Sequence, residues 1–101
     1  MRLLIGSILI LSSIFSHAQT GNLKGKLTDE ISGENLVGAY VRVVGTYGAA
    51  ISEADGTFII KNIKPGRYSV NISFIGYQQK IYNDIDIKAE VNTILNIKMV
   101  A

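Results

Sequence analysis

The sequence has no cysteine, no tryptophan and a single proline among its 101 residues. Disulfide bonds, thiolate metal sites and thiol nucleophiles all need cysteine, so this chain can form none of them. Its one histidine is His17, which falls in the leader-like segment described below. Without His17 there is no imidazole, which excludes Ser-His-Asp and Cys-His catalysis and the ligands of most hydrolytic zinc sites.

Other routes to catalysis find equally little support in the sequence. No glycine-rich phosphate loop occurs: Gly21 and Gly25 are isolated, and Gly45 and Gly48 flank Tyr47 in what looks like a connection between strands. Paired carboxylates, as glycosidases use them, need a cleft with walls, and a chain of this length has little material to build one. We therefore expect no enzymatic activity and no cofactor.

The first eighteen residues have the layout of a secretory signal peptide. Arg2 gives a positive start, residues 3–15 form an apolar run broken only by small residues, and Ser16 and Ala18 supply the small residues of a cleavage site. The run is shorter than the roughly 20 residues that span a bilayer. We predict cleavage between Ala18 and Gln19 and export of the remainder; an uncleaved membrane anchor is the alternative.

Residues 19–101 are expected to form one small domain, because they show no repeat, low-complexity tract or second change of composition. Arg2 is one of the ten Lys and Arg residues, so nine remain here against eight Asp and Glu, a net charge of +1. These charges are scattered, without the basic face of a nucleic-acid binder or of a membrane-surface helix. We expect no nucleic-acid partner and no transmembrane helix in this part.

Apolar and polar side chains alternate along most of this domain, with the period of two that is typical of half-buried strands. The cleanest alternation covers residues 66–77 and predicts a central strand. No window of helical length has apolar residues spaced three and four apart. The other expected strands cover residues 22–29, 37–46, 49–54, 57–63, 78–82, 85–88 and 91–99, of which 78–82 and 85–88 are short edge pieces.

Short strands with turn signals between them predict an all-β fold. Seven or so such strands must bury their apolar faces, which favours a seven-stranded antiparallel β-sandwich of two stacked sheets. A closed five-stranded barrel is the alternative. The expected core consists of Val41, Val43, Phe58, Tyr68, Val70, Ile72, Phe74, Leu95 and Ile97.

Two dipeptides predict tight turns between these strands. Asp55-Gly56 lies between two apolar runs and is typical of a type I′ hairpin turn, in which both central residues have positive φ. Pro65-Gly66 is typical of a type II turn, with Gly66 at the positive-φ position. Basic residues gather near this second turn, at Lys61, Lys64 and Arg67. We interpret them as a solvated loop, with a phosphate or lipid contact as the alternative.

Acidic residues close in sequence raise the question of a metal site. The segment after Glu53 has apolar residues where most calcium ligands of an EF-hand loop would stand, so we interpret Asp55 as a turn residue. Asp84 and Asp86 lie two residues apart on one face of an expected strand and in principle share a cation. Exposed charges that discourage pairing of edge strands are the simpler interpretation, and we predict no metal.

These residues together resemble the carboxypeptidase regulatory-like domain, a family of Ig-like or transthyretin-like β-sandwiches. The resemblance covers residues 23 to about 100 and is specific for the fold. In the carboxypeptidases this domain is an accessory to a separate zinc domain, so the resemblance does not imply peptidase activity. The positions that match the family pattern are Gly25, Asp29, Leu36, Gly38, Ala39, Val41, Asp55, Gly56, Phe58, Pro65, Gly66, Tyr68, Phe74, Gly76 and Tyr77, with Gly76 and Tyr77 at a further turn.

The order of a signal peptide followed by such a domain resembles the periplasmic N-terminal extension of TonB-dependent outer-membrane receptors in Bacteroidetes-type bacteria. This resemblance implies a non-catalytic module with protein partners at the outer membrane, either the receptor's own plug and barrel or the energy-transducing machinery. The alternative is a free-standing exported sandwich that binds carbohydrate or protein. For that alternative the candidate ligand-stacking residues are Tyr40, Tyr47 and Tyr82.

Overall fold

The computed structural model of this chain describes residues 19–101. The expected signal peptide and Ala18 lie outside the described residues, whereas Gln19 is the first of them. Residues 19–101 contain strands and connections and no helix. Nothing in this part is therefore a helix that could cross a membrane. The strands are β1 (Gly21–Asp29), β2 (Tyr40–Val43), β3 (Ala49–Ile51), β4 (Thr57–Ile63), β5 (Gly66–Ser73), β6 (Lys80–Ile87), β7 (Asn92–Ile94) and β8 (Ile97–Met99).

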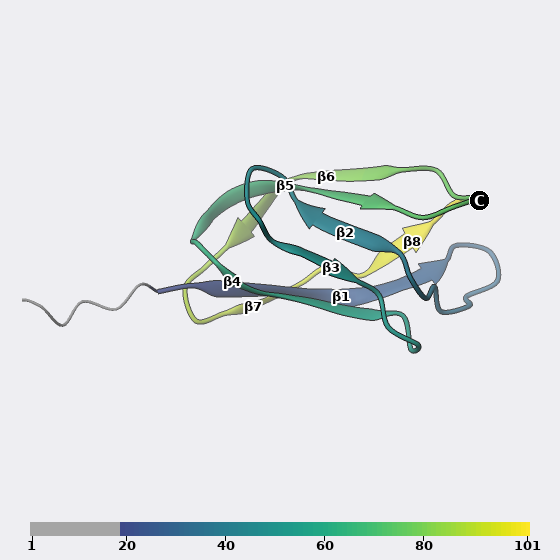
Figure 1. Cartoon of the computed structure of the whole chain (residues 1–101), viewed down its shortest axis with the longest axis horizontal. Helices are drawn as coiled ribbons and strands as arrows, with labels where there is room; N and C mark the ends of the chain where they lie inside the picture. Colours follow the sequence, from purple (N-terminus) through teal and green to yellow (C-terminus); the bar gives the residue numbers. More distant parts are fainter. Residues whose placement is uncertain (1–18) are drawn as a thin grey trace, which may run out of the picture.

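The strands form two sheets. One has the order β4-β1-β7, with β8 also paired to β1, and the other has the order β3-β2-β5-β6. Figure 1 shows them as two layers, with β1 and β4 along one side of the molecule and β5 and β6 along the other. The expected β-sandwich is confirmed, and β5 is a central strand, as the alternation over residues 66–77 predicted.

Two parts of the expected fold class were wrong: the sandwich has eight strands in the described residues, and its pairing is not antiparallel throughout. β1 pairs in parallel with β7 over Asn22–Lys24 and with β8 over Leu27–Asp29. Between these pairings the Leu95 N–H donates to the Lys24 carbonyl at 2.8 Å. A Cβ on Gly25 would lie 1.8 Å from the Leu95 carbonyl oxygen, so only glycine allows this close approach.

Residues 78–82 and 85–88, expected as separate edge pieces, belong largely to the single strand β6. A β-bulge explains the difference. Tyr68 pairs with Ile85 and Val70 with Tyr82, so two residues of β6 oppose Ser69 alone. Asp84 lies in this bulge with a φ of +57°. The extra residue shifts by one position the alternation of side chains between the two faces of the sheet. Because of that shift, the sequence pattern predicted two strands where the structure has one.

The turn at Asp55-Gly56 differs from the expected hairpin. It connects β3 to β4, which belong to different sheets, so it carries the chain across the sandwich. Gly56 has a φ of +79°, but Asp55 is not among the positive-φ residues, so the turn is not type I′. The Gly56 carbonyl accepts from the Leu27 N–H at 2.8 Å, and a Cβ on Gly56 would lie 2.7 Å from the Leu27 carbonyl oxygen. Glycine is required here for contact with β1.

The second expected turn also differs in type. Gly66 is the first residue of β5 and has a φ of +159°, close to the extended region and far from the roughly +80° of a type II turn. A glycine that combines such a φ with a four-residue turn is Gly76, whose φ is +84°. There the Tyr77 N–H donates to the Phe74 carbonyl at 3.1 Å and closes a four-residue turn before β6.

The core lies between the two sheets, as expected from the alternation. Of the predicted core residues, Tyr68, Phe74 and Leu95 are half-buried and pack against the core, and the others are buried. The prediction omitted several side chains from other strands and connections. Those buried side chains are Leu23, Leu27, Leu36, Ala39, Ile60, Ile63, Ile87 and Met99.

We predict that Ile72→Ala lowers the free energy of unfolding by about 2 to 5 kcal/mol, because the Ile72 side chain is completely buried and its removal leaves a cavity. Ile75 is 94% exposed, so Ile75→Ala is the matched control and should change stability by less than about 0.5 kcal/mol. Urea denaturation of both variants measures the difference. A loss below about 1 kcal/mol for Ile72→Ala would mean that β5 buries its other face.

Candidate functional site

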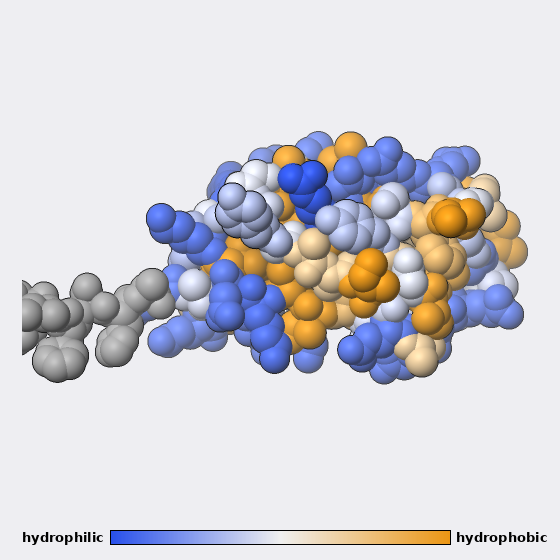
Figure 2. Space-filling view, in the orientation of Figure 1, coloured by the Kyte–Doolittle hydropathy of each residue, from blue (hydrophilic) through white to orange (hydrophobic). Residues whose placement is uncertain are grey.

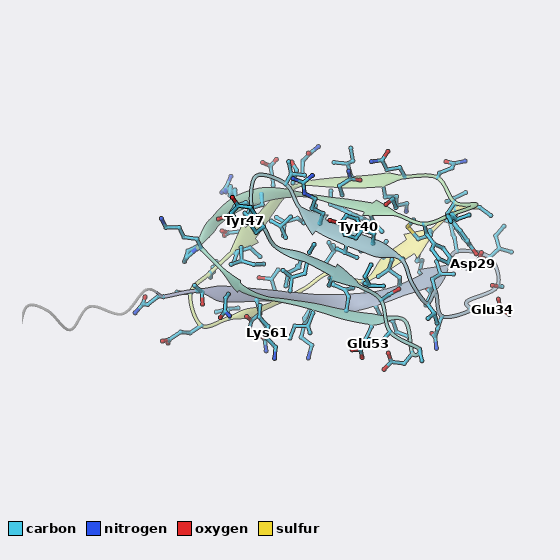
Figure 3. All side chains as sticks on the ribbon, viewed as in Figure 1. Asp29, Glu34, Tyr40, Tyr47, Glu53 and Lys61 are labelled. Carbon is cyan, nitrogen blue, oxygen red and sulfur yellow. The ribbon has the colours of Figure 1, made fainter. Side chains whose placement is uncertain are left out.

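The three tyrosines considered for ligand stacking do not lie on one surface. Tyr40 is opposite Ser73 and Ile51 on the outer face of the β3-β2-β5-β6 sheet and is 42% exposed. Tyr47 lies in the β2–β3 connection and is fully exposed. Tyr82 is opposite the buried Val70, so it lies on the inner face and packs against the core. Figure 3 shows Tyr40 and Tyr47 along the same side of the molecule.

Hollows on the described surface include the following three. One of about 390 Å³ lies over β1 and β4 and is lined by Lys24, Lys26, Glu53 and apolar side chains such as Ile59. A second, of about 410 Å³, lies beside Tyr40 and has no charged residue in its lining. The third, which we call the end hollow, has a volume of about 470 Å³. The end hollow is lined by Gly45, Thr46, Tyr47, Gly48, Lys61, Asn62, Ile63, Lys64 and Tyr68.

One wall of the end hollow is the tight connection between β2 and β3. Thr46 organises it: its hydroxyl donates to the Val43 carbonyl at 2.9 Å and accepts from the Gly48 N–H at 2.9 Å. The Val43 N–H also donates to the Gly48 carbonyl at 2.9 Å. Gly45 supplies the positive φ, +84°, that this tight path needs. These bonds hold the backbone on both sides of Tyr47, whose ring is left in solvent.

The opposite wall is the corner between β4 and β5. The Tyr68 hydroxyl donates to the Lys64 carbonyl at 2.5 Å. Asn62 has a φ of +61°, an uncommon conformation for a residue other than glycine, although asparagine tolerates it better than most. Its N–H donates to the Asn22 side-chain oxygen at 3.2 Å, which ties the corner to β1. Both walls are therefore fixed by hydrogen bonds before any ligand is present.

A hydrogen-bonded carboxylate, that of Asp29, lies at one end of the sandwich. One oxygen of Asp29 accepts from the Ser32 N–H at 2.8 Å and the Ile31 N–H at 2.9 Å, and the other accepts from the Tyr77 hydroxyl at 2.7 Å. The Ser32 N–H, the Tyr77 hydroxyl and the Ile31 N–H lower the pKa of Asp29 from 3.8 to about 2. The same contact with Asp29 raises the pKa of Tyr77. These hydrogen bonds favour the ionised form of Asp29. The bond from Tyr77 also has a structural role, because it joins two residues that are 48 positions apart in the sequence.

Another surface feature is the side of the sandwich where β3 and β4 lie next to each other. Both are edge strands: β3 pairs only with β2, and β4 only with β1. Each strand therefore has backbone N–H and C=O groups on its other side that no strand of its own sheet bonds. Each of the two strands carries one exposed isoleucine on the outer face of its own sheet: Ile51, opposite Tyr40, is 57% exposed, and Ile59, opposite Lys24, is 41% exposed. Figure 2 shows apolar residues between the two sheets on this face, with hydrophilic residues above and below. We call this side, defined by the adjacent edge strands β3 and β4, the β3–β4 edge.

The acidic residues of the described part of the chain do not gather into a metal site. Among residues 19–101 there is no group of three or more Asp, Glu, His or Cys residues that could hold a metal ion. Asp84 and Asp86 both lie on the edge strand β6. Asp84 is in the bulge, and Asp86 is opposite Arg67 of β5. The basic residues that the sequence analysis treated as a solvated loop contribute Lys61 and Lys64 to the end hollow. The sequence analysis did not predict that they line the same hollow as Tyr47, because the two loops are distant in sequence.

The family model of the carboxypeptidase regulatory-like domain matches residues 22–100. The chain belongs to this family. The TonB-dependent receptor SusC of Bacteroides thetaiotaomicron is 38% identical over 86 residues, which cover 85% of this chain and 8% of that protein. This carboxypeptidase regulatory-like domain thus corresponds to a small part of that much longer relative, and the family resemblance expected from the motifs is confirmed.

Solved structures with the same fold come from several bacteria. A chain of a type II cohesin–X-dockerin complex from Acetivibrio cellulolyticus has a TM-score of 0.69 at 21% identity, covering 78% of this chain and 56% of that chain. The TIE protein of Bacillus anthracis has a TM-score of 0.69 at 24% identity, covering 81% and 16%. A putative carbohydrate binding protein from Bacteroides uniformis has a TM-score of 0.59 at 18% identity, covering 77% and 40%. At these identities the likeness shows the sandwich fold alone.

We predict that Asp29→Asn flattens the pH dependence of stability in acid. The folded protein binds fewer protons than the unfolded chain between about pH 2 and pH 3.8, so the free energy of unfolding rises with pH across that window. The stabilisation is present above the ordinary pKa and is lost as the pH falls through about 2. Urea denaturation at closely spaced pH values measures the slope.

Tyr77→Phe is the matched variant for this experiment, because it removes one of the three hydrogen bonds to Asp29 and leaves the carboxylate in place. Its slope should fall between those of the wild type and Asp29→Asn. A wild-type slope in Asp29→Asn would show that the acid dependence arises from other carboxylates of the domain.

Proposed function

We propose that this domain is a non-catalytic interaction module at the periplasmic N-terminus of a TonB-dependent outer-membrane receptor. The observation that carries the proposal is the match to SusC, in which nearly all of this chain corresponds to 8% of a receptor. The proposed leader before residue 19 supports export. In this role the domain contacts the receptor's own plug or the energy-transducing machinery, and the rest of the receptor carries out transport.

The surface of the domain supports a role in protein binding better than a role in catalysis. The Asp29 carboxylate already accepts three hydrogen bonds within the fold. At the β3–β4 edge, by contrast, the edge strand β3 carries the exposed Ile51 on its outer face, a combination that favours pairing with an extended segment of another protein. We therefore assign the protein contact to the β3–β4 edge.

Removal of the domain tests this role in a receptor that carries it. Deleting residues 23–100 from the full-length receptor should reduce uptake of its nutrient while leaving the amount of receptor in the outer membrane unchanged. Growth on that nutrient as sole carbon source and quantification of the receptor in membrane fractions measure the two quantities. Normal growth with a normal receptor level would refute the proposal.

A pair of single substitutions tests the assigned surface. We predict that Ile51→Glu reduces uptake, because a carboxylate at the β3–β4 edge would be buried without a partner in the contact. Ile81→Glu is the matched control: Ile81 is 59% exposed against 57% for Ile51, but it lies on β6, the opposite edge of the same sheet. Equal uptake in both variants, with both folded, would place the contact elsewhere.

A further inference from the structure

We propose that the end hollow binds an acidic saccharide, namely a pyranose ring that carries a carboxylate. This goes beyond the role as a receptor module and does not depend on it. The end hollow lies between the β2–β3 connection and the β4–β5 corner, two loops that the sandwich brings together at one end. Its volume of about 470 Å³ lies within the range of small-molecule sites in proteins.

The aromatic side chains of the end hollow suit the flat, C–H-bearing face of a sugar ring. Tyr47 is fully exposed, so its ring faces are available for stacking. Tyr68 is half-buried in the opposite wall, and its hydroxyl is engaged by the Lys64 carbonyl, so its ring is held in place. The hydrogen bonds of Thr46 hold the backbone beside Tyr47, and a tyrosine side chain has only two χ angles to order when a ligand stacks on it.

The charge of the end hollow distinguishes it from the other two. Its lining includes Lys61 and Lys64 and no acidic residue. The lining of the hollow over β1 and β4 contains Glu53 beside its two lysines, and the hollow beside Tyr40 has no charged residue. Lysine ammonium groups offer three donors each and favour carboxylate, so the end hollow selects an anionic ligand. Figure 3 shows Lys61 and Tyr47 on the two opposing parts of the fold.

Polar groups in the lining add hydrogen bonds of the kind that sugar hydroxyls make. The Asn62 side-chain oxygen lies 3.5 Å from the Thr20 hydroxyl. The NH₂ group of the same Asn62 side chain supplies donors for a ligand. An anion without a ring, such as phosphate, would use the lysines and leave Tyr47 unused. The combination of an exposed ring, two cations and an amide therefore favours a carboxylate-bearing sugar over a phosphate group.

Titration of the purified chain with three probes tests the proposal. The probes are an α-1,4-linked tetramer of galacturonate, the neutral α-1,4-linked glucose tetramer, and inorganic phosphate. Two-dimensional ¹H–¹⁵N NMR follows the amide signals. The galacturonate tetramer should shift the signals of residues 45–48 and 61–64, and it should bind at least about tenfold more tightly than the neutral tetramer. Added salt should weaken this binding, because it screens the lysines.

Two variants and one control locate the site. Tyr47→Ala and Lys64→Ala should each weaken binding of the galacturonate tetramer by about tenfold. Tyr40→Ala removes another exposed tyrosine outside the end hollow and should leave binding unchanged. The amide spectrum of each variant shows whether it remains folded.

Three results would overturn the proposal: equal binding of acidic and neutral tetramers, signals that shift away from the end hollow, or shifts by phosphate as large as those by the galacturonate tetramer and insensitive to Tyr47→Ala. The last result would identify an anion contact without a sugar site. None of these measurements involves uptake, so their outcome is independent of the receptor role.

Discussion

Strand β1 is the element on which the rest of the structure depends, because three other strands pair with it. β4 lies on one side, and β7 and β8 share the other side in parallel register. Between β7 and β8 the chain passes close to the middle of β1 at Leu95. Gly25 makes this possible, because the absence of a side chain leaves room for the Leu95 carbonyl. The inner side chains of β1, Leu23 and Leu27, are completely buried, so pairing and core packing depend on the same strand.

The two ends of the sandwich are built differently. At one end Asp29 and Tyr77 join the first strand to the turn after β5, and the Gln78 N–H donates to the Val100 carbonyl at 2.7 Å nearby. These contacts satisfy their polar groups within the fold. At the other end the β2–β3 connection and the β4–β5 corner are each held by internal bonds, but the groups between them face solvent. The contacts at the first end thus join segments that are distant in sequence, whereas the other end leaves side chains such as Tyr47 in solvent.

Much of the fold could be predicted from the sequence, because alternation reports which side chains face the core. Alternation correctly predicted which side chains of β2 and β5 face the core, and that β5 is a central strand. Alternation carries no information about strand direction, so the parallel pairing of β1 was missed. It also fails at a bulge, which is why β6 looked like two strands at Asp84. Glycine indicated the turns, but their types depended on which sheet the next strand joined, as at Gly56 and Gly66.

The sequence by itself determined the chemistry available to this protein and the family to which it belongs. The absence of cysteine, the single histidine and the motif positions are properties of the chain that folding cannot change. Only the tertiary structure decided which side chains meet. Tyr47 lies across the end hollow from Lys61 and Lys64, whereas Tyr82 turns inward to the core. The physical reason is that contacts between distant segments depend on how the two sheets stack, and local patterns encode only the face of each strand.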